Sequence, residues 1–337
     1  MRKLAWVGVG VALFWLGWWA VLSFAVGQSI KTFLLEQRSA DIVTGVDDVS
    51  GGKSPLEVRK TLTGLTLADP HAGVSFAAPT VTFSVPTHWP GTMTLEASAL
   101  NFELNDPFIT LAGTFETARG YMHLRPGSAL AVEEIRLRAG RLQLAADGKD
   151  QIEAEGINFD FVQDPQTPRQ YHILSEIQGL TLGQAALKKL SPDGKLPGSV
   201  TQVSADLSAT FDRRWTRQAL SGTTPQLRAI EIRSVDLHWG GLRVMLNGRV
   251  AVDKTGIPVG TVRLRVREWE RMLAIATRVK IIAPAMQRQA RLFLNALSRF
   301  GDPPPGGLDL ELRFEDGLMW LATIQLGEAP RFFPPTR

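Results

Sequence analysis

The chain has 337 residues, of which 44% are hydrophobic and 21% charged, with a net charge of +4 and no cysteine. The absence of cysteine excludes disulfides, thiolate catalysis and cysteine-ligated metal sites. The positive charges are dispersed along the chain, so we expect no nucleic-acid partner.

The first residues have the pattern of a membrane anchor. Arg2 and Lys3 precede an uncharged run from Leu4 to Val26. As a helix this run is roughly 34 Å long, and the hydrocarbon core of a bilayer is about 30 Å thick. The positive flank predicts a single pass through a bacterial inner membrane, with a cytoplasmic N-terminus and the bulk of the chain in the periplasm. The expected anchor residues are Leu4, Trp6, Phe14, Trp15, Trp18, Trp19, Leu22 and Val26.

A cleaved secretory signal is the alternative, since Ser23, Ala25 and Gly27 are small enough to precede a cleavage site. Signal cores usually contain about 7–15 apolar residues, and this run is longer, which favours an uncleaved anchor over residues 1–28. Residues 29–55 read as a juxtamembrane helix followed by a linker rich in Asp, Ser, Gly and Pro.

Residues 56–329 predict one large, mainly β domain. Apolar and polar residues alternate most clearly from Val203 to Phe211, as in a half-buried antiparallel strand. Weaker alternation marks further strands at 81–85, 93–104, 108–115, 132–144, 152–161, 230–239, 244–252 and 259–266. Because the phase slips within 93–104 and after Val132, we expect bulged, bent strands. Asp147-Gly148, Asn247-Gly248 and Asp316-Gly317 are tight-turn dipeptides, and together these features predict a long antiparallel meander.

One long segment after the linker has helical period. From about residue 268 to residue 300 the apolar side chains fall on one face of a helix. Pro284 predicts that this helix is kinked or divided into two. A closing hairpin around Asp316-Gly317 follows, and residues 330–337 form a loose tail. The fold expected is therefore a transmembrane helix, then a large bent antiparallel sheet with one kinked amphipathic helix near the C-terminus.

Residues that carry chemistry form no recognisable constellation. The five histidines are scattered, with no zinc-type spacing, and no serine has the strand–elbow–helix context of a nucleophile. We therefore expect no enzymatic activity, no cofactor and no metal. Arg263, Arg265 and Arg267 alternate with apolar residues, which indicates a solvated strand face or, as an alternative, a face toward acidic lipid headgroups.

The order of several motifs resembles a known family. Leu62-Thr-Gly-Leu65, Ala78-Pro79, Trp89-Pro90, Asp236-Leu-His-Trp239 and the Asp316-Gly317 hairpin follow a single N-terminal anchor. The pattern is similar to the Gram-negative envelope family named domain of unknown function 2125 and, more distantly, to AsmA-like periplasmic proteins. AsmA-like proteins are implicated in moving lipids through elongated apolar β grooves, so the distant resemblance implies lipid handling. This chain departs from that pattern in having no cysteine and in being short for a bridge across the periplasm.

Two functions remain open. In the first, a groove in the bent sheet binds a lipid or another apolar ligand for envelope maintenance, and the anchor keeps the protein at the inner membrane. The residues expected to line such a groove are Val203, Ala205, Leu207, Ala209, Phe211, Val244, Leu246 and Ile324. In the second, the same side chains fill a closed core and the protein is a scaffold for an envelope complex. The partners expected are therefore the inner membrane and, in the first function, a lipid, and the sequence identifies no particular protein partner.

Overall fold

The computed structural model describes residues 43–332, apart from 53, 71–72, 90, 107–108, 147–149, 217–218, 220–223, 279–286, 299–306 and 322–323. The anchor and the juxtamembrane helix expected before residue 43 lie outside the described residues. Among the residues that are described, no helix has both the length and the apolar character that crossing a membrane requires. The chain divides into two compact units, residues 1–149 and 150–337.

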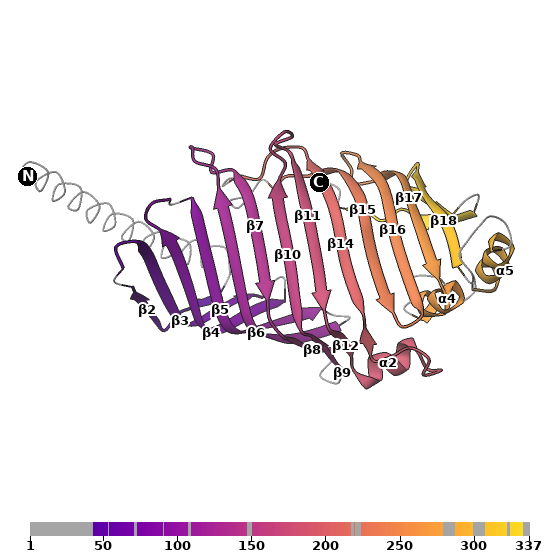
Figure 1. The fold of residues 1–337 in the computed structure, drawn as a ribbon, viewed down its shortest axis with the longest axis horizontal. Coiled ribbons are helices and arrows are strands. Elements are labelled where there is room, and N and C mark those ends of the chain that lie inside the picture. The colour runs from indigo at the N-terminus through magenta and orange to yellow at the C-terminus, as the bar shows by residue number, and fades with distance from the viewer. Residues whose placement is uncertain are drawn as a thin grey trace, which may run out of the picture. The chain divides into compact units, whose positions relative to one another are not determined.

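The first unit is an antiparallel meander (Figure 1). Its strands are β1 (Val43–Gly45), β2 (Asp48–Gly51), β3 (Glu57–Asp69), β4 (Val74–Pro86), β5 (Thr92–Asp106), β6 (Ile109–Leu124), β7 (Val132–Ala139) and β8 (Leu142–Ala146). Strands β3 to β6 pair consecutively, β1 and β2 pair in turn along β3, and β7 and β8 both pair along β6. The alternation predicted for 132–144 is thus divided between two strands.

The two phase slips of the sequence have different structures. After Val132 the register of β7 on β6 shifts, because Leu124 pairs with Val132 and His123 with Glu134, so Glu133 is an extra residue in β7. The bulge predicted there is confirmed. In β5, Ser98 pairs with Thr117 and Leu100 with Phe115, so one residue is left unpaired on each strand and the register does not shift. The slip in β5 is therefore not a bulge. Ala99 instead has a φ of 48°, and Ala97 and Leu100 on either side of it pack in one cluster with Ala78 and Val81.

The second unit is also antiparallel. Its strands are β9 (Asp150–Ala154), β10 (Gly156–Gln163), β11 (Gln170–Gln178), β12 (Leu180–Leu182), β13 (Ser199–Val200), β14 (Gln202–Phe211), β15 (Leu227–Trp239), β16 (Leu242–Val252), β17 (Pro258–Arg267), β18 (Gly307–Glu315), β19 (Leu318–Leu321) and β20 (Ile324–Glu328). Strands β10, β11 and β14 to β20 pair in that order, and β12 lies between β9 and β13. The mainly β, antiparallel fold is as predicted.

The turn dipeptides have different outcomes. Asp316 and Gly317, with φ of 53° and 74°, connect β18 to β19 as predicted. The prediction of a turn at Asn247-Gly248 is wrong, because both residues lie inside β16, where Gly248 pairs with Val262. A Cβ on Gly248 would collide with the backbone of Thr261, so glycine here permits a close approach of β16 to β17. Asp147-Gly148 lies outside the described residues.

In the described part of the second unit, three helices pack against one hydrophobic cluster. They are α2 (Gln184–Leu190), α4 (Trp269–Arg278) and α5 (Gln287–Leu297), and α4 and α5 lie next to β17 and β18 in Figure 1. The segment predicted at 268–300 contains two helices, and Pro284 falls among residues that are not described. The buried side chains Trp269, Leu273 and Leu294 pack in one cluster with side chains of β15 to β18. We name these residues and their neighbours Leu196, Val200, Trp239, Leu242, Val266, Leu308 and Leu310 the helix-covered core.

Candidate apolar binding face

One face of the second unit is apolar across six strands, β11 and β14 to β18. Residues paired across strands share a face, so the register defines rows of side chains. The first row contains Ile177, Val203, Leu237, Val244, Val266 and Leu308. The second contains Ser175, Ala205, Val235, Leu246, Leu264 and Leu310. The third contains Ile173, Leu207, Ile232, Gly248, Val262 and Leu312, and the fourth Tyr171, Ala209, Ile230, Val250, Gly260 and Phe314.

Helices cover one end of this face. In the first row Val266 and Leu308 are buried members of the helix-covered core, and Val203, Leu237 and Val244 pack against it. The Trp239 indole N–H, which would otherwise be a buried unpaired donor, donates to the Pro197 carbonyl at 2.8 Å. The first row, apart from Ile177, therefore belongs to a close-packed core.

An aromatic cluster covers the other end. Phe161 stacks on Tyr171 with ring centroids 4.4 Å apart, and Phe211 and Trp215 meet this pair edge-on. Tyr171 is 0% exposed, and its hydroxyl oxygen accepts the Trp215 backbone N–H at 3.1 Å. Such ring pairs add about 0.5–1.5 kcal/mol to the effect of burial. No local sequence pattern predicts this cluster, because its members come from β10, β11, β14 and the loop after β14.

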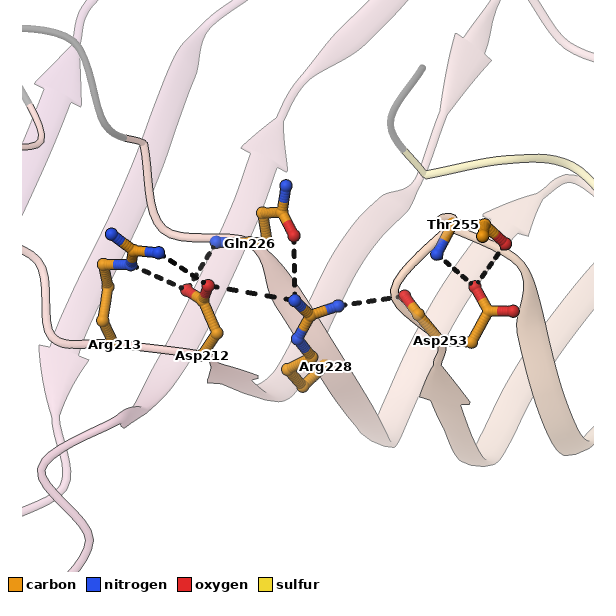
Figure 2. Close-up of polar contacts among 6 residues, drawn as sticks. All are labelled: Asp212, Arg213, Gln226, Arg228, Asp253 and Thr255. Carbon is orange, nitrogen blue, oxygen red and sulfur yellow. Dashed lines mark hydrogen bonds and ion pairs between the residues drawn. The ribbon is translucent and has the colours of Figure 1, made fainter. Parts of the chain in front are cut away.

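Polar contacts hold the loop that carries Trp215 (Figure 2). Asp212 accepts hydrogen bonds from the Gln226 backbone N–H at 2.9 Å and from the Arg213 guanidinium at 3.2 Å, and it lies 3.8 Å from Arg228. Arg228 also donates to the Asp253 carbonyl of the β16–β17 turn at 3.0 Å. Burial raises the pKa of Asp212, but these hydrogen bonds outweigh it and hold that pKa below its usual value. The carboxylate therefore stays charged and ties the loop to β15.

Between the two covered ends lies an apolar strip, which we define as Ala205, Leu207, Ile232, Val235 and Leu246. Each of these side chains is partly accessible to solvent, and none belongs to the helix-covered core. The residues predicted to line a groove therefore lie in different parts of the face. Val203 and Val244 pack toward the helices, Ala209 is buried and Phe211 joins the aromatic cluster. The backbone of Ile324 lies in β20, and its side chain is outside the described residues.

The opposite face of the sheet is polar. Arg263 makes two hydrogen bonds to the Asp309 carboxylate, at 2.7 and 2.6 Å, and Arg265 makes one at 3.3 Å. Two of the three arginines that alternate along β17 are therefore engaged with the neighbouring strand, which agrees with the solvated-face interpretation.

A second polar group on this face contains residue types found in nucleophilic enzymes. His172 Nε2 lies 2.7 Å from Asp206 Oδ1, and Arg233 donates to the Ser208 hydroxyl oxygen at 2.7 Å. Ser208 is buried and its hydroxyl is occupied by Arg233, so the arrangement ties β11, β14 and β15 together. Among the described residues, no group of three or more His, Asp or Glu could hold a metal ion.

Asp309 makes the stability of this face depend on pH. The Arg263 hydrogen bonds hold the pKa of Asp309 below its usual 3.8, against the opposing effect of burial and with help from Arg265. A carboxyl group whose pKa is lower in the folded state stabilises the folded protein at pH values above its unfolded-state pKa. That stabilisation is lost as the pH falls through the folded-state pKa.

We expect Asp309→Asn to destabilise the protein at pH 7, with the difference from wild type shrinking below about pH 4. Urea unfolding from pH 7 to pH 3 measures this. Glu176→Gln, at an exposed carboxylate of β11, is the control, and an equal pH dependence in both variants contradicts the prediction.

Comparison with known proteins agrees with the resemblance to domain of unknown function 2125. A search of curated proteins finds no match. One family model matches residues 19–330, which covers nearly all of the chain and both units. The chain therefore belongs to the bacterial family described as "Uncharacterized protein conserved in bacteria (DUF2125)".

Proposed function

We propose that this protein binds the acyl chains of an amphipathic molecule on the apolar strip of its second unit. Its N-terminal segment anchors it in the bacterial inner membrane, and the β units lie in the periplasm. In this role it is a non-enzymatic protein that binds lipid or passes it on for envelope maintenance. The observation that carries the proposal is the partial exposure of five aliphatic or small side chains on adjacent strands.

The chemistry of the strip favours an apolar ligand. The side chains at Ala205, Leu207, Ile232, Val235 and Leu246 contain no hydrogen-bonding group. Covering such a surface releases about 25 cal/mol for each Å² removed from water, and grouped apolar exposure marks binding sites more often than scattered exposure does. Since both ends of the face are already covered, a ligand adds most burial between them.

A scaffold is the alternative function. It is favoured by the helix-covered core, in which Val266, Leu273 and Leu308 are almost fully buried, as in a protein whose apolar face is filled by its own side chains. The two functions differ in what covers the strip: a ligand in the first, and the surrounding side chains in the second.

Native mass spectrometry of the full chain, gently extracted from membranes, tests the proposal. We expect an added mass of lipid on the wild type and its loss in Leu246→Thr, which places a hydroxyl on the strip. Met245→Thr is the matched control, because Met245 is the preceding residue of β16 and faces the other side of the sheet. A wild-type protein without bound lipid contradicts lipid binding. The same preparation tests the anchor, since an anchored chain stays in the inner-membrane fraction after an alkaline wash.

A further inference from the structure

A hollow of about 500 Å³ opens beside the helices of the second unit. Helices α4 and α5 and the segment after α2 line it. Its apolar lining includes Leu190 and Trp269, which also belong to the helix-covered core or pack against it. The hollow is therefore next to the covered end of the apolar face, in the same unit as the apolar strip.

Charged side chains dominate the rest of the lining. The cations are Lys195, Arg271, Arg278 and Arg291, and the anions are Asp193, Glu268 and Glu270. At neutral pH this set has one positive charge in excess.

Two of the anions already have partners. Glu268 forms an ion pair with Arg271. Asp193 accepts a hydrogen bond from the Ser191 hydroxyl at 2.8 Å and the backbone N–H of Lys195 at 3.5 Å. These contacts leave Arg278 and Arg291 as the guanidinium groups available to a ligand.

Arg278 and Arg291 reach the hollow from different helices. Arg278, in the last turn of α4, donates one N–H to the Leu190 carbonyl at 2.7 Å, which fixes its guanidinium at the rim. That bond uses one of five N–H groups, so others remain for a second acceptor. Arg291 projects from α5 and is exposed. Guanidinium groups match the oxygen geometry of phosphate and bind it through paired hydrogen bonds.

We propose that this hollow binds the phosphate group of a phosphodiester, held by Arg278 and Arg291. A diester carries one negative charge, which matches the single excess positive charge, whereas a phosphate monoester carries nearly two at pH 7. Building on the proposed function, the diester is the headgroup phosphate of an amphipathic ligand whose acyl chains lie on the apolar strip.

The test compares three probes on the full chain in a mild non-ionic detergent. Dihexanoyl phosphatidylglycerol carries the diester and acyl chains, dihexanoylglycerol carries the acyl chains alone, and dimethyl phosphate carries the diester alone. Isothermal titration calorimetry measures each affinity for the wild type, Arg291→Gln and Arg288→Gln. Arg288 is the matched control, because it is exposed on the same helix and does not line the hollow.

We expect Arg291→Gln to weaken phosphatidylglycerol binding about tenfold or more, the usual effect of losing a charged hydrogen bond, and to leave dihexanoylglycerol binding unchanged. Arg288→Gln should leave the binding of both probes unchanged.

Equal weakening of phosphatidylglycerol binding by the two variants, or no weakening by Arg291→Gln, overturns the phosphate site. If the two acyl probes bind equally well, the phosphate site fails and the proposed function stands. Binding of dimethyl phosphate alone, sensitive to Arg291→Gln, supports a site for a soluble diester and contradicts acyl binding. Both replacements are at exposed residues, and circular dichroism checks that the variants remain folded.

Discussion

Leu294→Asp is expected to lower the free energy of unfolding by about 4 kcal/mol or more. Leu294 lies on α5, is 4% exposed and belongs to the helix-covered core. A carboxylate at this position would be buried without a partner, which costs several kcal/mol, while a typical domain is stable by only about 5–15 kcal/mol. Urea unfolding of the full chain, followed by circular dichroism, measures the difference.

Leu292→Asp is the control on the same helix. Leu292 is 66% exposed, so the same change there should alter stability by no more than about 0.5 kcal/mol. The pair separates burial from helix propensity, because both variants replace leucine by aspartate within α5. Large losses of equal size in the two variants would mean that aspartate itself destabilises α5, whereas small losses in both would mean that α5 does not pack on the sheet.

The main features of the fold follow from local patterns. Alternation from Val203 to Phe211 predicts β14 almost to its ends, and the phase slip after Val132 predicts the bulge of β7. These signals are local, because a strand that covers a core on one face must alternate and a bulge must break the alternation. The apolar period at 268–300 likewise predicts α4 and α5, whose apolar faces share one core.

Other elements depend on partners that are distant in the chain. The alternation at 152–161 continues through Glu155, yet β9 pairs with β12 and β10 with β11. Nothing near Glu155 specifies that change of partner. Helix α2 is seven residues long and has no side-chain cap, so it lacks both the length and the capping residue by which helices are recognised. Its position depends on packing against the helix-covered core through Leu187 and Leu190.

The candidate site shows the same limit. Ala205 and Ala209 are equivalent in the sequence, since both are small residues on the apolar face of β14. Ala209 pairs with Tyr171 and is 3% exposed, whereas Ala205 pairs with Ser175 and is partly accessible. The cross-strand neighbour, which lies on β11, decides which alanine is buried. Alternation therefore predicts which side chains share the face, and the register is needed to show which of them a ligand could reach.

This difference gives the sharpest test of the apolar strip. Ala209→Trp should destabilise the protein by about 1–3 kcal/mol or more, because the indole has to displace Tyr171 in a close-packed aromatic cluster. Ala205→Trp should keep wild-type stability within about 1 kcal/mol, since a partly accessible position tolerates added volume. It should also abolish lipid binding, because the indole occupies the space above Leu207 and Val235 that the acyl chains would need.

Urea unfolding and native mass spectrometry of the full chain measure the two effects on the same samples. Ala205→Ser is the control, because it replaces the same residue without adding the bulk of an indole. It should retain both stability and bound lipid. If Ala205→Trp unfolds as readily as Ala209→Trp, the strip is close-packed and the scaffold function takes the place of lipid binding. If Ala205→Trp folds and its lipid content is unchanged, the acyl chains bind elsewhere. Stable folding with lost lipid is the result that only an open, ligand-covered strip produces, because the variant would be destabilised if the strip were a filled core and would keep its lipid if the acyl chains bound at a distant site.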